Sequence, residues 1–142
     1  MQNYPSDHYA ITFWNHGGGI FKDNKWKGDT KSICWDDNSG LYDYIDQKEV
    51  KQILSNLYSQ NSNNKIDLIG YDVCILGALE TSYQAKDYAH VCIASGANEP
   101  NNGWDWKFLG EITSNPTMNA RTLGNHIAVS YTHLTLPTIC SV

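Results

Sequence analysis

Two residues that can carry out nucleophilic chemistry follow strand-like apolar runs in this chain of 142 residues. His16 comes after the run Tyr-Ala-Ile-Thr-Phe-Trp-Asn, and Cys74 comes after Lys-Ile-Asp-Leu-Ile-Gly-Tyr-Asp-Val. Catalytic residues are often set at the carboxyl ends of parallel strands. A cysteine attacks a carbonyl as its thiolate, and a nearby imidazole takes the proton or stabilises that thiolate. The pair therefore predicts a cysteine–histidine hydrolase, in which the fold must join residues 74 − 16 = 58 positions apart.

Each of the two segments also has a structural interpretation. A strand can end in a tight glycine turn, and a cysteine can be an inert core residue. However, the three glycines after His16 leave the backbone unshielded. The N–H of Gly17 is expected to reach an oxyanion, with the N–H of Cys74 as a second donor. Because both segments fit one reaction, catalysis is the preferred interpretation.

Four runs of residues resemble, in the same order, the clostripain family of bacterial cysteine peptidases. They are residues 14–19, 33–37, 70–80 and 94–104. The resemblance extends from residue 4 to about residue 128. It implies a caspase-like α/β/α sandwich with a mostly parallel sheet, incomplete at both ends. It also implies that His16 and Cys74 form a catalytic dyad that cleaves peptide bonds after arginine or lysine.

The resemblance assigns a substrate role to Asp72. In the family, the acidic residue two positions before the nucleophile lines the pocket for the basic side chain. The alternation of side chains along a strand predicts that Asp72 and Cys74 point to the same side. A carboxylate there can pair with a guanidinium or an ammonium group. The alternatives are that Asp72 caps the following helix or orients His16.

Residues 99–104 follow another strand-like run and resemble the pocket-wall loop of the family. Relatives often carry an acidic residue near the position of Asn102, so the pocket is expected to be less acidic here. Trp104 is expected to form an apolar wall for a substrate side chain, with a core position as the alternative. Ser95 and Glu99 are expected to contact the substrate.

Composition narrows the class of partner. The net charge of −5 and the pI of about 5.4 argue against a nucleic-acid partner, since no basic stripe is present. The expected partners are peptides or proteins with basic residues. No apolar run has the length of a membrane span, and the start of the chain lacks the features of a signal peptide. By the resemblance, a secreted or cell-envelope location is expected rather than a cytoplasmic one.

Alternating strands and helices predict an α/β fold with parallel strands. Asp46 and Glu49 form a capping box at the start of a helix whose buried face repeats at helical spacing. The residues of that face are Val50, Ile53, Leu54 and Leu57. A second helix is expected over residues 75–88, which would place Cys74 beside a helix N-terminus that favours a thiolate. A third is expected over residues 118–128, starting just after Pro116.

Clustered aspartates suggest a second hypothesis, because carboxylates are ligands for calcium. The cluster contains Asp36, Asp37, Asp43 and Asp46. Its spacing matches no EF-hand loop, and caps or solvated turns explain the residues equally well. No cofactor is expected to be required, and no other metal site is expected. A calcium-binding structural domain and a non-catalytic peptide-binding module therefore remain as alternatives.

By the resemblance, residues 1–128 are expected to be the central part of a clostripain-like catalytic domain. Residues 129–138 match the translation of a transposase-based sequencing adaptor, so residues 129–142 are expected to be a non-native tail. His133 and Cys140 are excluded as site residues on this ground.

The polar loop between Lys22 and Lys31 holds four lysines and is expected to be a self-cleavage site.

Overall fold

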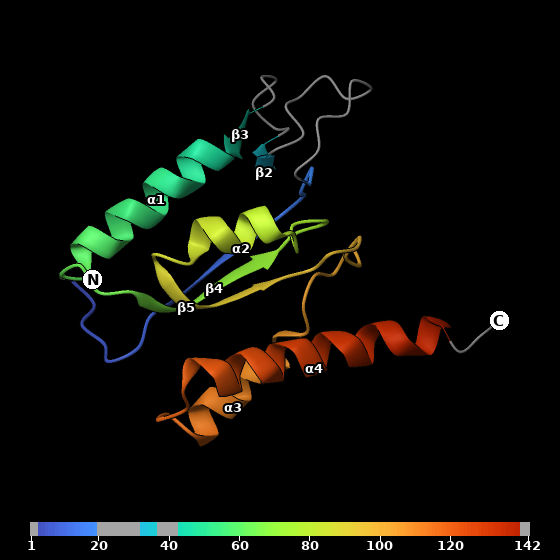
Figure 1. Ribbon diagram of the computed structural model, residues 1–142. Coiled ribbons are helices and arrows are strands. Elements are labelled where there is room, and N and C mark those ends of the chain that lie inside the picture. The colour runs from blue at the N-terminus through green and yellow to red at the C-terminus, as the bar shows by residue number, and fades with distance from the viewer. Residues whose placement is uncertain (1–2, 20–31, 37–42, 140–142) are drawn as a thin grey trace. The chain divides into compact units, whose positions relative to one another are not determined.

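The computed structural model describes residues 3–19, 32–36 and 43–139 (Figure 1). The chain divides into two compact units, residues 1–99 and 100–142, and each is described by itself. The first contains β1 (Ala10–Trp14), β2 (Ser32–Asp36), β3 (Asp43–Asp46), α1 (Gln47–Gln60), β4 (Ile66–Asp72), α2 (Leu79–Ala85) and β5 (Ala89–Ala94). The second contains the 3-10 helix η1 (Trp106–Phe108), α3 (Leu109–Ser114) and α4 (Ala120–Ile139). The lysine loop of residues 22–31, Asp37 and Cys140 lie outside the described residues.

The first unit is built on a parallel sheet with the strand order β1-β4-β5. The central strand, β4, is buried along almost its whole length, as expected for a middle strand of a parallel sheet. Phe13 and Tyr71 are register partners in β1 and β4, and their rings stack with centroids 5.5 Å apart. The predicted α/β fold with parallel strands is confirmed.

Helix α1 begins where the capping box predicts. The Asp46 side chain accepts hydrogen bonds from the N–H groups of Lys48 and Glu49, and the Glu49 carboxylate accepts one from the Asp46 N–H. Val50 and Leu54 are buried on one face of the helix, and Ile53 and Leu57 pack against the same core. Helices α1 and α2 lie on the same side of the parallel sheet (Figure 1).

The helix after Cys74 is shorter than predicted. It begins at Leu79 instead of residue 75, so Cys74 does not lie at its N-terminus. The reason is that the intervening N–H groups bond elsewhere: Ile75 donates to the Ala97 carbonyl at 3.1 Å and Gly77 to the Ser95 carbonyl at 2.6 Å. Long-range contacts of this kind leave no local sequence signal. The prediction that a helix dipole acts directly on Cys74 is wrong.

Two further differences concern β3 and α4. Strand β3 was not expected, and it pairs with β2 in an antiparallel two-stranded sheet with an irregularity between Ile33 and Asp36. Helix α4 spans Ala120–Ile139, so it begins two residues later and ends later than the predicted range of 118–128. Asn119 caps this helix, because its side chain accepts a hydrogen bond from the Thr122 N–H at 2.9 Å.

The second unit has a small aromatic cluster. Trp104 and Phe108 are buried, and the ring of Trp106 lies 6.1 Å from that of Trp104 and 5.4 Å from that of Phe108. Helix α4 continues without a break through residue 129, and the origin of residues 129–142 stays a prediction. None of the described helices combines the length and apolar character that a membrane crossing requires.

Candidate active site

The register of β1 against β4 brings His16 and Cys74 to the same end of the sheet, where the two strands end. Ala10 is opposite Leu68 and Trp14 is opposite Asp72, offsets of 68 − 10 = 58 and 72 − 14 = 58 positions. His16 and Cys74 lie two residues beyond the last pair and differ by the same 58 positions. Because the strands are parallel, both residues leave the sheet at its carboxyl end. The sequence separation of the two residues is therefore also the register of the two strands.

The loop after β1 lies directly against Cys74. A Cβ atom built on Gly17 would lie 2.5 Å from the Cys74 carbonyl oxygen and 3.2 Å from its backbone nitrogen. One on Gly19, which has a φ of +72°, would lie 3.3 Å from Cγ2 of Ile75. Glycine is needed at position 17 because any side chain would meet backbone atoms. The two amides predicted to serve as oxyanion donors thus belong to adjoining stretches of backbone.

Strand β2 fixes the other side of the His16 loop. The Cys34 N–H donates to the His16 carbonyl at 3.2 Å, and the Gly18 N–H donates to the Ser32 carbonyl at 3.1 Å. Gly17 and Ile33 form an antiparallel bridge between these two bonds. In such an arrangement the bonds come from the flanking residues, so the pairing does not use the N–H of Gly17. The His16 side chain is exposed.

Asn15 shapes the turn that carries His16, and it was not among the predicted site residues. Its Oδ1 accepts a hydrogen bond from the His16 N–H, and its Nδ2 donates to the Trp35 carbonyl at 3.2 Å. Its φ of 152° lies in a region that most residues avoid. An asparagine between a strand and a glycine run is a known turn former, so this signal was available in the sequence.

The Cys74 thiol is half-buried and contacts the backbone of Glu99. The Glu99 N–H donates to Cys74 Sγ at 3.2 Å, and Sγ donates to the Glu99 carbonyl at 3.9 Å. Ile75, the next residue, has a φ of 58°, an unfavourable value for a β-branched residue. Steric strain directly after a candidate nucleophile is typical of functional sites.

The predicted substrate contacts are spread over both units. Asp72 is the last residue of β4, so the alternation of side chains along the strand does not extend to Cys74. The Asp72 side chain is buried, with 2% exposure. The Ser95 hydroxyl accepts from the Ala97 N–H at 3.2 Å and donates to the Ala97 carbonyl at 3.1 Å. Oε2 of Glu99 is buried. Asn102 and the buried Trp104 belong to the second unit.

Two other thiols differ from Cys74 in their surroundings. Burial raises the pKa of Cys34, against a smaller lowering effect of its hydrogen bond to the Trp14 backbone. Burial also raises the pKa of Cys92, opposed by a hydrogen bond with Ser82. Both thiols are therefore poor nucleophiles at neutral pH.

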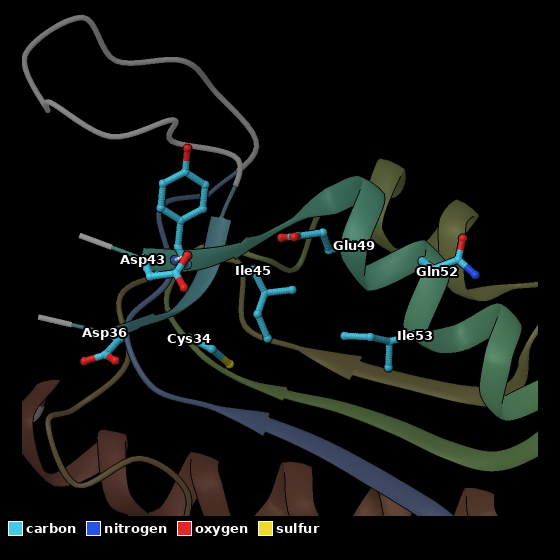
Figure 2. Close-up of a pocket in the computed structure, with 8 residues that line it drawn as sticks. Cys34, Asp36, Asp43, Ile45, Glu49, Gln52 and Ile53 are labelled. Atoms are coloured by element: carbon cyan, nitrogen blue, oxygen red, sulfur yellow. Dashed lines mark hydrogen bonds between the residues drawn. The ribbon is translucent and has the colours of Figure 1, made fainter. Parts of the chain in front are cut away.

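A pocket of about 390 Å³ lies between β2, β3 and α1, and His16 and Cys74 do not line it (Figure 2). Its lining includes Cys34, Asp36, Asp43 and Glu49. The Glu49 carboxylate is already used in the capping box. Among residues 3–19, 32–36 and 43–139, no three His, Cys, Asp or Glu side chains group as a metal site requires. A calcium role for the aspartates stays a prediction, since Asp37 is not among these residues.

Comparisons with known proteins agree with the arrangement of the strands. The chain is 31% identical over 88 residues to clostripain of Hathewaya histolytica, which covers 59% of this chain and 15% of that protein. It is also similar to a solved structure of a secreted C11 cysteine protease from Bacteroides thetaiotaomicron, in complex with an irreversible peptide inhibitor. That match has a TM-score of 0.65 and 23% identity, and it covers 96% of this chain and 34% of the other. The likeness shows a shared caspase-like fold, and this chain spans about a third of the length of that solved chain.

The sequence profile of the Clostripain family matches residues 1–138. This range contains both chemistry-bearing loops, the parallel sheet that joins them and the second unit through most of α4. The chain belongs to the clostripain family.

Proposed function

We propose that this chain carries the catalytic residues of a cysteine endopeptidase that cleaves after arginine or lysine. The observation that supports it best is the coincidence of the 58-residue register between β1 and β4 with the separation of His16 and Cys74. If His16 only ended a turn and Cys74 were an inert core residue, their separation in the sequence would not need to equal the register offset of the two strands. The backbone contact between Gly17 and Cys74 also supports a catalytic role for these loops.

In this proposal the Cys74 thiolate attacks the carbonyl carbon of the scissile bond, and the carbonyl oxygen becomes an oxyanion. The N–H groups of Gly17 and Cys74 stabilise that oxyanion. His16 takes the thiol proton and later gives a proton to the leaving amine, which departs and leaves a thioester on the sulfur. Water then hydrolyses the thioester and regenerates the thiol.

Asp72 is proposed to bind the basic side chain of the substrate. It is a carboxylate at the carboxyl end of the central strand, two residues from Cys74, and it is almost fully buried. A buried carboxylate binds a guanidinium strongly, since water competes little for either group. The natural substrates are then peptides or proteins with exposed basic residues. A location outside the cytoplasm is proposed in line with the secreted relative from Bacteroides thetaiotaomicron.

An arginyl acyloxymethyl ketone tests the proposal, because it is an affinity label for a thiol beside a site that binds arginine. We expect mass spectrometry to find the label on Cys74, and we expect its rate of attachment to fall strongly in His16→Ala. Cys92→Ala is the matched control and should label like the unaltered protein. Equal labelling of Cys34, Cys74 and Cys92, together with no cleavage of an arginyl peptide, would favour a non-catalytic binding module.

A further inference from the structure

We infer that the backbone segment of residues 95–99 is a positioning element for the Cys74 sulfur, with the Glu99 N–H as its hydrogen-bond donor and Gly77 as the residue that lets the segment approach. The inference deepens the proposed function, since it rests on Cys74 being the nucleophile. It assigns to Glu99 a role of its main chain that is separate from any substrate contact of its side chain.

The contact between Glu99 and Cys74 favours the ionised sulfur. The Glu99 N–H lies 3.2 Å from Sγ, whereas the Glu99 carbonyl oxygen lies 3.9 Å from it. A thiolate is attracted by the N–H and repelled by the carbonyl, and the shorter of the two contacts dominates. A hydrogen bond donated to the charged form of a group stabilises that form. This donor takes the place of the helix N-terminus, which lies further along the chain at Leu79.

Two backbone hydrogen bonds hold the segment against the nucleophile loop. The Ile75 N–H donates to the Ala97 carbonyl at 3.1 Å, and the Gly77 N–H donates to the Ser95 carbonyl at 2.6 Å. The Ser95 hydroxyl bridges the N–H and the carbonyl of Ala97 and so fixes the bend between them. Glu99 follows two residues later, and its N–H is aimed at Sγ by this framework.

Gly77 makes the approach possible. A Cβ atom on Gly77 would lie 2.6 Å from the Gly96 nitrogen and 2.7 Å from the Ser95 carbonyl carbon. Both are backbone atoms, so a side chain could be accommodated only by moving the segment. A Cβ on Gly96 would meet only the Gly77 oxygen, at an ordinary distance of 3.8 Å. The two glycines face each other, yet only Gly77 is required by the space available.

The first test removes the donor. Glu99→Pro deletes the N–H, and Glu99→Gln keeps it while removing the charge of the side chain. The rate of alkylation of Cys74 by iodoacetamide is followed against pH by peptide mapping. We expect the midpoint of the profile to move up by about one pH unit in Glu99→Pro, with about tenfold slower labelling at pH 7, and not to move up in Glu99→Gln. Equal profiles for the two folded variants would overturn the inference.

The second test moves the segment without altering the donor. Gly77→Ala should shift the alkylation midpoint upward, whereas Gly96→Ala should leave it in place. This pair decides the matter if Glu99→Pro does not fold, as judged by circular dichroism. Unshifted profiles in both glycine variants would contradict the role of Gly77.

Cleavage of an arginyl peptide is measured separately in the unaltered protein, so that the two hypotheses fail in different ways. A thiol that depends on Glu99 and Gly77 in a protein that cleaves no peptide would contradict the proposed function alone. If the protein cleaves the peptide and the midpoint of Cys74 alkylation is unchanged in all four variants, the positioning role alone would be contradicted.

Discussion

Gly17 and Cys74, which lie 57 positions apart in the sequence, are in backbone contact at the carboxyl end of the parallel sheet: a Cβ on Gly17 would be 2.5 Å from the Cys74 carbonyl oxygen. The contact follows from the register of β1 with β4, which places the two loops opposite each other. It makes the glycine after His16 a packing requirement as well as a source of an N–H donor.

Substitution of Gly17 should therefore affect both stability and catalysis. Gly17→Ala forces two backbones apart, and we expect the free energy of unfolding to fall by about 1–3 kcal/mol. Displacement of an oxyanion donor should lower kcat for an arginyl peptide by about 100-fold. Urea denaturation and steady-state kinetics measure the two effects.

Gly110→Ala is the control for that substitution, because nothing lies within 4 Å of a Cβ at this position in α3. Alanine there should be neutral or stabilise the protein by up to about 1 kcal/mol. A Gly17→Ala variant that matched it in both measurements would show that the loop can move away from Cys74 at no cost.

The reactivity of the three described cysteines should separate with pH. Burial raises the pKa of Cys34 and of Cys92, so both hold less thiolate at neutral pH than an exposed cysteine does. Cys74 should react first with iodoacetamide at pH 7, and the labelling of the other two should rise as the pH increases past 9. Time-resolved peptide mapping provides the measurement. Faster labelling of Cys92 than of Cys74 at pH 7 would argue against Cys74 as the nucleophile.

Asp72→Asn tests the substrate pocket. Loss of the carboxylate should lower kcat/KM for an arginyl peptide by a factor that corresponds to about 2–4 kcal/mol, while a small alkylating agent still reacts with Cys74. Asp87→Asn, in the exposed turn before β5, is the control and should leave kcat/KM unchanged. A preference for arginine over a neutral residue that survives Asp72→Asn would assign Asp72 a structural role.

Tyr71 is expected to limit stability at alkaline pH. Its hydroxyl is buried, and no hydrogen-bond partner for it is found among the described residues. Burial, with a smaller contribution from Cys92, raises its pKa above the usual 10. Below pH 10 the tyrosine is neutral in both states. Above pH 10 it ionises first in the unfolded protein, so the stability that it contributes is lost as the pH rises.

Tyr71→Phe removes this ionisation and keeps the ring that stacks on Phe13. We expect the variant to be at least as stable as the unaltered protein at pH 7, by up to about 1 kcal/mol, with a larger difference at pH 11. Urea denaturation at the two pH values gives the comparison. A stability loss of more than about 1 kcal/mol at pH 7 would mean that the hydroxyl has a favourable partner.

Local chemistry in the sequence was enough to predict several elements. Asp46 and Glu49 determine the start of α1 through bonds that span three residues, and the spacing of Val50 and Leu54 determines which face of the helix is buried. The apolar run before Cys74 is the buried central strand β4, as such runs are in parallel sheets, and the run before His16 is β1, in which only Phe13 is buried. The family resemblance, carried by short motifs, was likewise readable from the sequence alone.

Only the tertiary structure decided where those motifs meet. The register of β1 with β4 and the contact of Gly17 with Cys74 arise from pairing across more than 50 residues, for which no local pattern exists. The same holds for the late start of α2 and for the Glu99 donor at the thiol, since both depend on amides that bond to a segment about 20 residues away. The sequence by itself determined which residues could do the chemistry, and long-range backbone contacts decided which of their neighbours touch the sulfur.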